Sequence, residues 1–237
     1  YTNNSPDTLR YIWFHLWPNA YKNDRTAFSE QLLELGRTDF YFSDDEKRGY
    51  INRLDFKVDG VTAQLEDHPL YIDVTLLILP VPLAPGQTIR ITTPFHEKIP
   101  FNFSRGGHVG HTYQITQWYP KPAVYDNDGW HSMPYLDQGE FYSEFGNFKV
   151  RITVPKDYVV AATGNLQNEG EEKLLWEKSK EVPEPLKDHS KKIVKSTSNQ
   201  NRLKAVKLTP PGKEHKQLIS KTNGKGQPII TQQKLEK

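Results

Sequence analysis

The sequence contains no cysteine and a single methionine among its 237 residues. Without cysteine there are no disulfides, and no zinc site can be built from thiolate ligands. No apolar run reaches the roughly 18 residues that a membrane-spanning helix needs, so the sequence predicts no such helix. Neither sign of charge dominates, since 31 Lys and Arg stand against 29 Asp and Glu. These absences exclude disulfides, thiolate zinc sites and a membrane-spanning helix within this sequence.

Charge and aromatic residues are divided unevenly along the chain. Residues 1–170 hold 15 Lys and Arg against 21 Asp and Glu, a balance of −6. Residues 171–237 hold 16 against 8, a balance of +8, and Trp176 is their single aromatic residue. A segment that is rich in charge and poor in apolar residues cannot bury enough surface to fold by itself. We therefore expect a folded domain over 1–170, followed by a Lys-rich tail or linker of low order over 171–237.

Short apolar stretches with the period of a strand recur through the first 170 residues. The clearest is Phe148–Val154, where apolar and polar residues alternate strictly, as in a strand with one buried face. Pro and Gly turns separate these stretches, which favours an all-β fold, an antiparallel β-sandwich. The strands expected are Tyr11–Trp17, Tyr50–Val58, Val61–Leu65, Tyr71–Leu79, Thr88–Thr93, Tyr113–Tyr119, Phe148–Val154 and Tyr158–Ala162.

Local signals predict the helix and the turns. Asp24 or Thr26 is placed to cap a short helix that runs through Leu35, and Gly36 is placed to stop it. Asp59-Gly60 is a strong hairpin signal because both residues tolerate positive φ. Within the tail, one further strand is expected at Lys173–Trp176.

Three segments in a fixed order carry a resemblance to a known family. They read QWYPKPAVYDNDGWH from Gln117, EFYSEFGNFKVRITVP from Glu140, and YVVAATG from Tyr158. This order resembles the N-terminal β domain of aminopeptidase N-like zinc metallopeptidases (gluzincins), bacterial branch. The resemblance covers roughly Tyr1 to Leu175. It implies a saddle-like β-sandwich that forms one side of a peptide-substrate cleft.

The zinc motif of this family, HExxH, does not occur in the sequence, and the substrate-anchoring GxMEN motif is also missing. The resemblance therefore implies a non-catalytic domain, with no catalytic residue and no metal ligand in this chain. Zinc and aminopeptidase activity are implied only for a longer parent protein, whose catalytic domain would be the partner of this chain and would bind the peptide substrate. Export to the periplasm, cell envelope or medium is expected from the family, although this chain starts at Tyr1 without a signal peptide.

A glycine-rich loop from Phe103 to His111 is the first candidate site. Its glycines allow the backbone to approach a partner closely. The family carries a Gln-x-Glu or Gln-x-Gln pair in this segment, which holds the substrate amine, but the matching positions fall near Val109 and His111. The candidate cleft or interface residues are Arg105, Gly106, Gly107, His108 and His111.

An aromatic loop between Trp118 and Tyr142 is the second candidate site. We expect it to fold back to the same sandwich edge as the glycine-rich loop, so that the two together dock on the catalytic domain. Core packing or stacking on a ligand are the alternative roles for its rings. On the docking interpretation Trp130 and Tyr135 are exposed. The candidate docking residues are Trp118, Tyr119, Trp130, Tyr135 and Glu140.

Other motifs have plainer explanations. His108 and His111 could ligate zinc, but no third ligand is identifiable, so we expect loop histidines. Asp126–Gly129 lacks the later Glu of a calcium loop and predicts a turn. Glu140 and Glu144 could act as an acid/base pair, although exposed glutamates are the commoner outcome. No aromatic residues alternate with the tail lysines, so we expect no nucleic-acid binding.

The sequence is also compatible with two other functional classes. The chain could be a free-standing β-sandwich module that binds carbohydrate or peptide. It could also be an enzyme in its own right, although the missing zinc motif counts against that.

Overall fold

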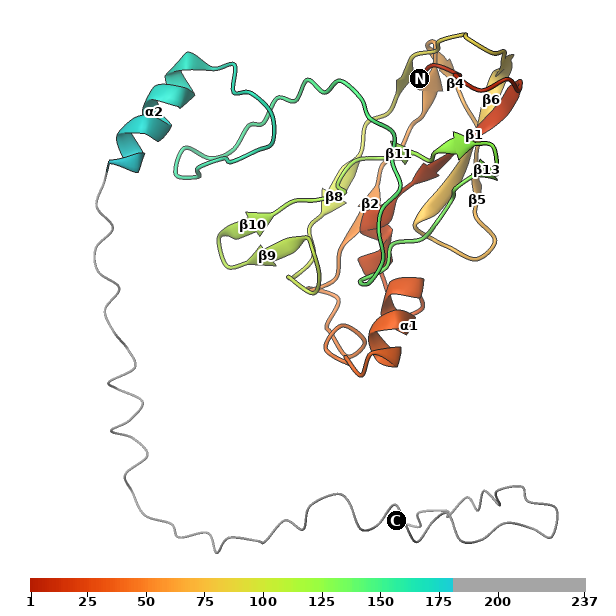
Figure 1. Cartoon of the computed structure of the whole chain (residues 1–237). Coiled ribbons are helices and arrows are strands. Elements are labelled where there is room, and N and C mark those ends of the chain that lie inside the picture. The colour runs from red at the N-terminus through yellow and green to blue at the C-terminus, as the bar shows by residue number, and fades with distance from the viewer. Residues whose placement is uncertain (181–237) are drawn as a thin grey trace, which may run out of the picture. The chain divides into compact units, whose positions relative to one another are not determined.

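The computed structural model describes residues 1–180, and the chain divides into two compact units, Tyr1–Arg151 and Ile152–Lys237 (Figure 1). Most of the predicted basic tail, residues 181–237, lies outside the described residues. Antiparallel strands in several sheets dominate the part that is described, and two α-helices accompany them. The predicted all-β fold is confirmed.

The largest sheet has four strands in the order β11-β1-β6-β5. Its central pair is β1 (Leu9–His15) and β6 (Val74–Leu83), flanked by β5 (Leu65–Asp67) and β11 (Lys121–Pro122). In the β1–β6 register, Ile12 lies opposite Leu77. A second sheet of three strands is ordered β4-β3-β7 and contains Val61–Thr62, Lys57–Val58 and Ile91–Thr92.

One apolar core lies between these two sheets. The larger sheet contributes Ile12, Phe14 and Leu77. The smaller sheet contributes Val58 of β3 and Phe56, the residue just before that strand. The rings of Phe14 and Phe56 meet edge to face across the core, 4.9 Å apart. Two antiparallel sheets that bury facing side chains form a sandwich.

Three two-stranded sheets complete the strands of unit 1. They pair β2 (Tyr50–Asn52) with β8 (His96–Lys98), β9 (Gly107–Val109) with β10 (Thr112–Gln114), and β12 (Tyr125–Asp126) with β13 (Gly129–Trp130). The glycine-rich segment is therefore a hairpin rather than an irregular loop. The predicted strand Tyr113–Tyr119 is shorter than expected, because the chain leaves the hairpin after Gln114 and Gln117 takes φ +55°.

A second core surrounds the helix of unit 1. The chain leaves β1 into a 3-10 helix, η1 (Trp17–Tyr21), where the sequence had predicted that the strand would reach Trp17. The helix α1 (Ala27–Glu34) begins as expected, because Thr26 Oγ1 accepts a hydrogen bond from the Ser29 amide at 3.2 Å. This core is mostly aromatic: Trp17, Ala20, Tyr21, Phe28, Leu32, Phe40, Phe103 and Tyr135.

Residues with positive φ set two strand boundaries in the smaller sheets. Asp59 and Gly60 have φ of +49° and +86° and join β3 to β4, as the hairpin signal predicts. The single strand expected over Tyr50–Val58 is wrong: it is split into β2 and β3, and Arg53 with φ +58° lies between them. The strand expected over Tyr71–Leu79 is shifted along the chain, because β6 runs from Val74 to Leu83 and includes Pro80 and Pro82.

The two strands predicted near the end of the domain are absent from the described residues. No strand forms over 148–154 or 158–162, and the apolar side chains of the alternating stretch are exposed: 68% for Phe148, 53% for Val150 and 42% for Val154. The alternation is present, but within residues 1–180 no sheet edge pairs with this backbone.

The second unit contains α2 (Glu169–Ser179), so the strand expected at Lys173–Trp176 is wrong. Asn168 caps this helix, because its Oδ1 accepts a hydrogen bond from the Glu171 amide at 3.1 Å. Three glutamates in its first turn complement the positive end of the helix dipole. Among residues 1–180, no helix has both the length and the apolar character needed to cross a membrane.

Candidate functional site

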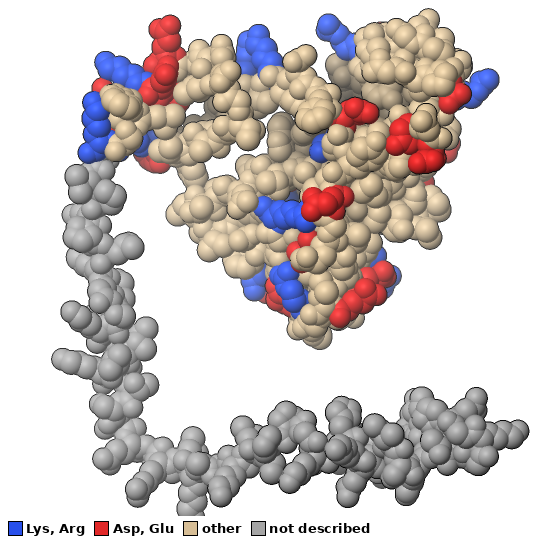
Figure 2. All heavy atoms as spheres, in the orientation of Figure 1, with Lys and Arg blue, Asp and Glu red and all other residues tan. Residues whose placement is uncertain are grey.

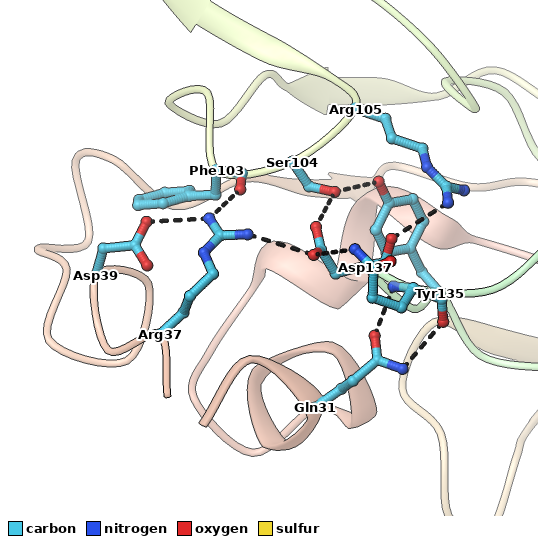
Figure 3. A network of polar contacts seen from close by, with 9 residues as sticks. Gln31, Arg37, Asp39, Phe103, Ser104, Arg105, Tyr135 and Asp137 are labelled. Atoms are coloured by element: carbon cyan, nitrogen blue, oxygen red, sulfur yellow. Dashed lines mark hydrogen bonds and ion pairs between the residues drawn. The ribbon is translucent and has the colours of Figure 1, made fainter. Parts of the chain in front are cut away.

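The two candidate loops meet at a network of polar contacts that we call the loop network (Figure 3). Ser104 Oγ donates to Asp137 Oδ1 at 2.7 Å, and the Tyr135 hydroxyl lies 3.1 Å from the same Ser104 oxygen. Arg105 donates to the carbonyl oxygens of Asp137 and Gly139 at 3.2 and 2.8 Å. The aromatic loop therefore folds back onto the glycine-rich segment, as predicted.

Arg37, just after α1, joins the same network. Its guanidinium donates to the Phe103 carbonyl at 2.7 Å and to Asp137 Oδ2 at 3.3 Å (Figure 3). Burial acts to raise the pKa of Asp137, but the hydrogen bond from Ser104 and the nearby arginines outweigh it and lower that pKa. Asp137 is thus a fixed anion that holds three separate segments together.

The exposure expected for Tyr135 is wrong. Tyr135 is 2% exposed and belongs to the aromatic core around α1, where its ring lies 5.3 Å from that of Tyr21. Trp130 is half-buried, packed against the sandwich core and against Tyr125. A ring in a loop can serve as a core residue when the loop folds back over the body, and that fold-back depends on contacts distant in sequence.

The remaining candidates of the aromatic loop lie in different surroundings. Trp118 contacts Phe95 and Tyr119, with ring centroids 5.9 and 5.2 Å apart. Glu140 is exposed. The five docking candidates therefore do not form one continuous surface, although the loop that carries them is anchored at the expected edge.

The β9–β10 hairpin separates the two loop histidines. His108 lies in β9, where its ring stacks on Tyr113 at 5.4 Å, and His111 lies in the turn. Gly107 is required in β9, because a Cβ there would come within 2.7 Å of the Asn102 backbone. No group of three His, Cys, Asp or Glu side chains within residues 1–180 is placed to hold a metal ion.

Beneath the hairpin lies a small cavity of about 20 Å³, room for one or two water molecules. Its lining includes Trp17, Tyr21, Glu97, Gly106, Gly107 and Tyr135. Burial raises the pKa of Glu97 to about 7. A carboxyl group that titrates near neutral pH in a mostly apolar cavity is a recognised feature of functional sites.

Sequence reasoning missed three titratable residues around these loops. Glu97 is half-buried. The other two are buried: Asp73, which accepts a 2.6 Å hydrogen bond from the Tyr135 amide, and His15, whose Nε2 lies 3.2 Å from the His131 carbonyl oxygen. Burial raises the pKa of Asp73 to about 6 and lowers that of His15 to about 4. The signal for Asp73 was visible as a lone acid inside the apolar run Tyr71–Leu79.

The predicted turn Asp126–Gly129 is confirmed. It joins β12 to β13, and Asp126 Oδ1 accepts from the Asp128 amide at 3.0 Å and lies 2.7 Å from His131 Nε2. The hydrogen bond with His131 lowers the pKa of Asp126.

Comparison of this chain with models of protein families, with curated proteins and with solved structures found no match.

Proposed function

We propose that this chain is the non-catalytic N-terminal domain of a zinc aminopeptidase-like metallopeptidase, and that it forms one side of the peptide-substrate cleft. The observation that carries the proposal is the ordered set of segments between Gln117 and Gly164, which resembles that family. The chain has no HExxH motif. We therefore assign zinc, and the chemistry it supplies, to a catalytic domain elsewhere in the parent protein.

Two structural features support a partner domain. The first is the loop network, which holds the glycine-rich hairpin and the aromatic loop at one edge of unit 1. The second is the hairpin itself, where Val109 and Tyr113, on its two opposite faces, are 54% and 46% exposed. An isolated two-stranded hairpin is marginally stable in water, so a hairpin with apolar side chains facing outward gains from a covering partner.

The coding sequence beyond Lys237 is the first test. The proposal expects an HExxH motif and a downstream glutamate within about 200 residues, as the zinc-binding helix of such enzymes requires. A coding sequence in which no metallopeptidase follows, with none encoded beside it, would contradict the proposal.

The docking edge has its own test, with the catalytic domain expressed separately and association measured by titration calorimetry. Val109→Lys places a charge at an exposed position of the β9–β10 hairpin and should weaken association at least about tenfold, as expected for a charge buried without a partner. Val81→Lys is the matched control, because Val81 is a strand valine with 73% exposure that lies in β6. Equal effects of the two substitutions would place the contact elsewhere.

A further inference from the structure

A continuous row of aromatic rings crosses unit 1 away from the loop network. It begins in the β5–β6 connection, passes over β1, and ends in the β12–β13 hairpin. Neighbouring ring centroids in the row lie 4.8, 5.0, 6.4, 6.2 and 5.0 Å apart. In order, the members are Tyr71, His68, Trp13, Tyr11, Trp130 and Tyr125.

The centre of the row lies on the outer face of the four-stranded sheet. Ile12 and Phe14 of β1 point into the sandwich core, so Tyr11 and Trp13 point to the opposite face. Tyr11 is 38% exposed, and none of the other rings in the row is fully buried. The row therefore presents apolar ring surface to solvent. Its last two members, Trp130 and Tyr125, belong to the aromatic loop, and the other four lie outside both candidate loops.

Carboxylates accompany the row. Glu66 of β5 lies opposite Leu76, which lies opposite Trp13, so Glu66 shares the outer face with that ring. Its exposed carboxylate makes no hydrogen bond or ion pair within residues 1–180. At the other end, Asp7 accepts a 2.8 Å hydrogen bond from the Tyr125 hydroxyl. Figure 2 shows Asp and Glu side chains gathered where Figure 1 places β1 and β13.

Positive charge is scarce around the row. Burial lowers the pKa of His68, which keeps its ring neutral at pH 7. Arg10, exposed next to Tyr11, is the cation nearest in sequence. Residues 1–151 as a whole carry 14 Lys and Arg against 19 Asp and Glu, a balance of −5.

We propose that this aromatic row is a docking surface for a cationic polypeptide segment of a partner protein, whose Lys or Arg side chains lie over the rings and whose charges face Glu66 and Asp7. The faces of aromatic rings attract cations, and Arg guanidinium groups stack on them readily. Carboxylates beside the rings add charge complementarity and favour a basic partner over an acidic one.

The ring geometry favours this ligand over a sugar chain. A carbohydrate strand stacks best on rings whose faces lie in one plane. Here Tyr11 and Trp13 meet at 78°, and Trp13 and His68 meet at 60°. Rings at these angles leave separate faces that suit individual side chains.

The test uses the full chain and a nine-residue arginine peptide as the probe, with binding measured by titration calorimetry. Tyr11→Leu and Trp13→Leu keep apolar bulk but remove the ring, and each should weaken binding about threefold to fivefold. Glu66→Gln should weaken binding by a similar factor at about 50 mM salt, and much less at about 300 mM, because salt screens exposed charges.

Matched controls come from α1 and the segment that follows it. Phe42→Ala removes an aromatic ring that is 76% exposed, and Glu34→Gln neutralises an exposed glutamate on α1. Neither should change the affinity. If Trp13→Leu fails to fold, as judged by its circular dichroism spectrum and melting temperature, the test uses Tyr11→Leu instead, because Tyr11 is the more exposed residue.

Three results would overturn the proposal. The first is no binding of the arginine peptide at about 1 mM, the weakest affinity of interest. The second is binding that Tyr11→Leu and Glu66→Gln leave unchanged, or that the controls reduce equally. The third is binding of the neutral sugar cellohexaose, rather than the arginine peptide, that depends on Trp13, which would assign the row to a carbohydrate.

Discussion

Two stretches with strong strand signals have opposite environments in this molecule. In β6 (Val74–Leu83), Val74 and Leu77 are 2% and 0% exposed, and strands β1 and β5 pair on either side. In residues 148–154 the alternation is stricter, yet Phe148 and Val150 are 68% and 53% exposed. An alternating pattern shows that a segment could bury one face, but burial also requires a sheet edge that accepts its backbone hydrogen bonds.

The difference bears on the proposed function. If the proposed function is right, the catalytic domain is expected to supply the sheet edge that residues 148–154 lack within residues 1–180.

The largest effect should come from a core position in β6. Leu77→Ala should lower the free energy of unfolding by about 3 kcal/mol, because it leaves a cavity at a fully buried site. Val150→Ala should change it by less than about 0.5 kcal/mol, as usual for an exposed position. Urea unfolding followed by tryptophan fluorescence measures both. A cost of about 2 kcal/mol or more for Val150→Ala would show that the stretch is packed after all.

A pH titration should show the next largest effect, at the entrance to β6. Burial raises the pKa of Asp73 to about 6, although the hydrogen bond from the Tyr135 amide opposes this. Between about pH 4 and pH 6 the Asp73 carboxyl then binds more protons in the folded state than in the unfolded state. The contribution of Asp73 to the free energy of unfolding should therefore fall by about 2–3 kcal/mol as pH rises through this window, and level off above it. His15 acts in the opposite direction, because burial lowers its pKa to about 4, so the Asp73 contribution is read from the difference between the chain and a variant without this carboxyl.

Asp73→Asn isolates this contribution, because the amide oxygen can still accept the Tyr135 hydrogen bond. The variant should lose the part of the slope between about pH 4 and pH 6 that belongs to Asp73. Glu97, with its pKa raised to about 7, acts in the same direction and should preserve a weaker slope toward neutral pH. Identical slopes in Asp73→Asn and the unmodified chain would show that Asp73 is not perturbed.

Local features of the fold were predictable from the sequence because their causes are local. The Thr26 cap, the Asp59-Gly60 hairpin and the Asp126–Gly129 turn each depend on residues within four positions of one another. The recurrence of short strand signals in unit 1 also predicted the β-sandwich. Some strand ends were predicted wrongly, because the backbone at Arg53 and Gln117 takes positive φ and no glycine in the sequence signals it.

Long-range contacts explain what sequence reasoning missed. The burial of Tyr135 depends on the return of its loop to the core around α1, and Asp137 joins segments about a hundred residues apart in the chain. The meeting of the two candidate loops was expected from their order, but the role of Ser104 and Arg105 in fixing it was not. Glu97 gave no signal, because its burial arises only when the hairpin covers it.

The loop network differs from both β6 and residues 148–154, because side-chain contacts rather than strand pairing hold it in place. Ser104→Ala removes the hydroxyl that contacts both Asp137 and Tyr135, and should lower the free energy of unfolding by about 1 kcal/mol. Ser132→Ala is the control, because no hydrogen bond of its hydroxyl is found among residues 1–180. Thermal unfolding of both variants measures the difference, and equal stabilities would show that the network adds nothing.

The central claim, a non-catalytic domain of a zinc aminopeptidase, is tested most directly by zinc content and turnover in parallel. This chain and the intact gene product would each be purified, then assayed by elemental analysis and with an aminoacyl-anilide substrate. We predict about one zinc per molecule and chelator-sensitive turnover in the intact product, with neither in this chain, since metal binding requires the complete ligand set. Stoichiometric zinc with turnover in this chain, or an intact product without zinc, would contradict the account.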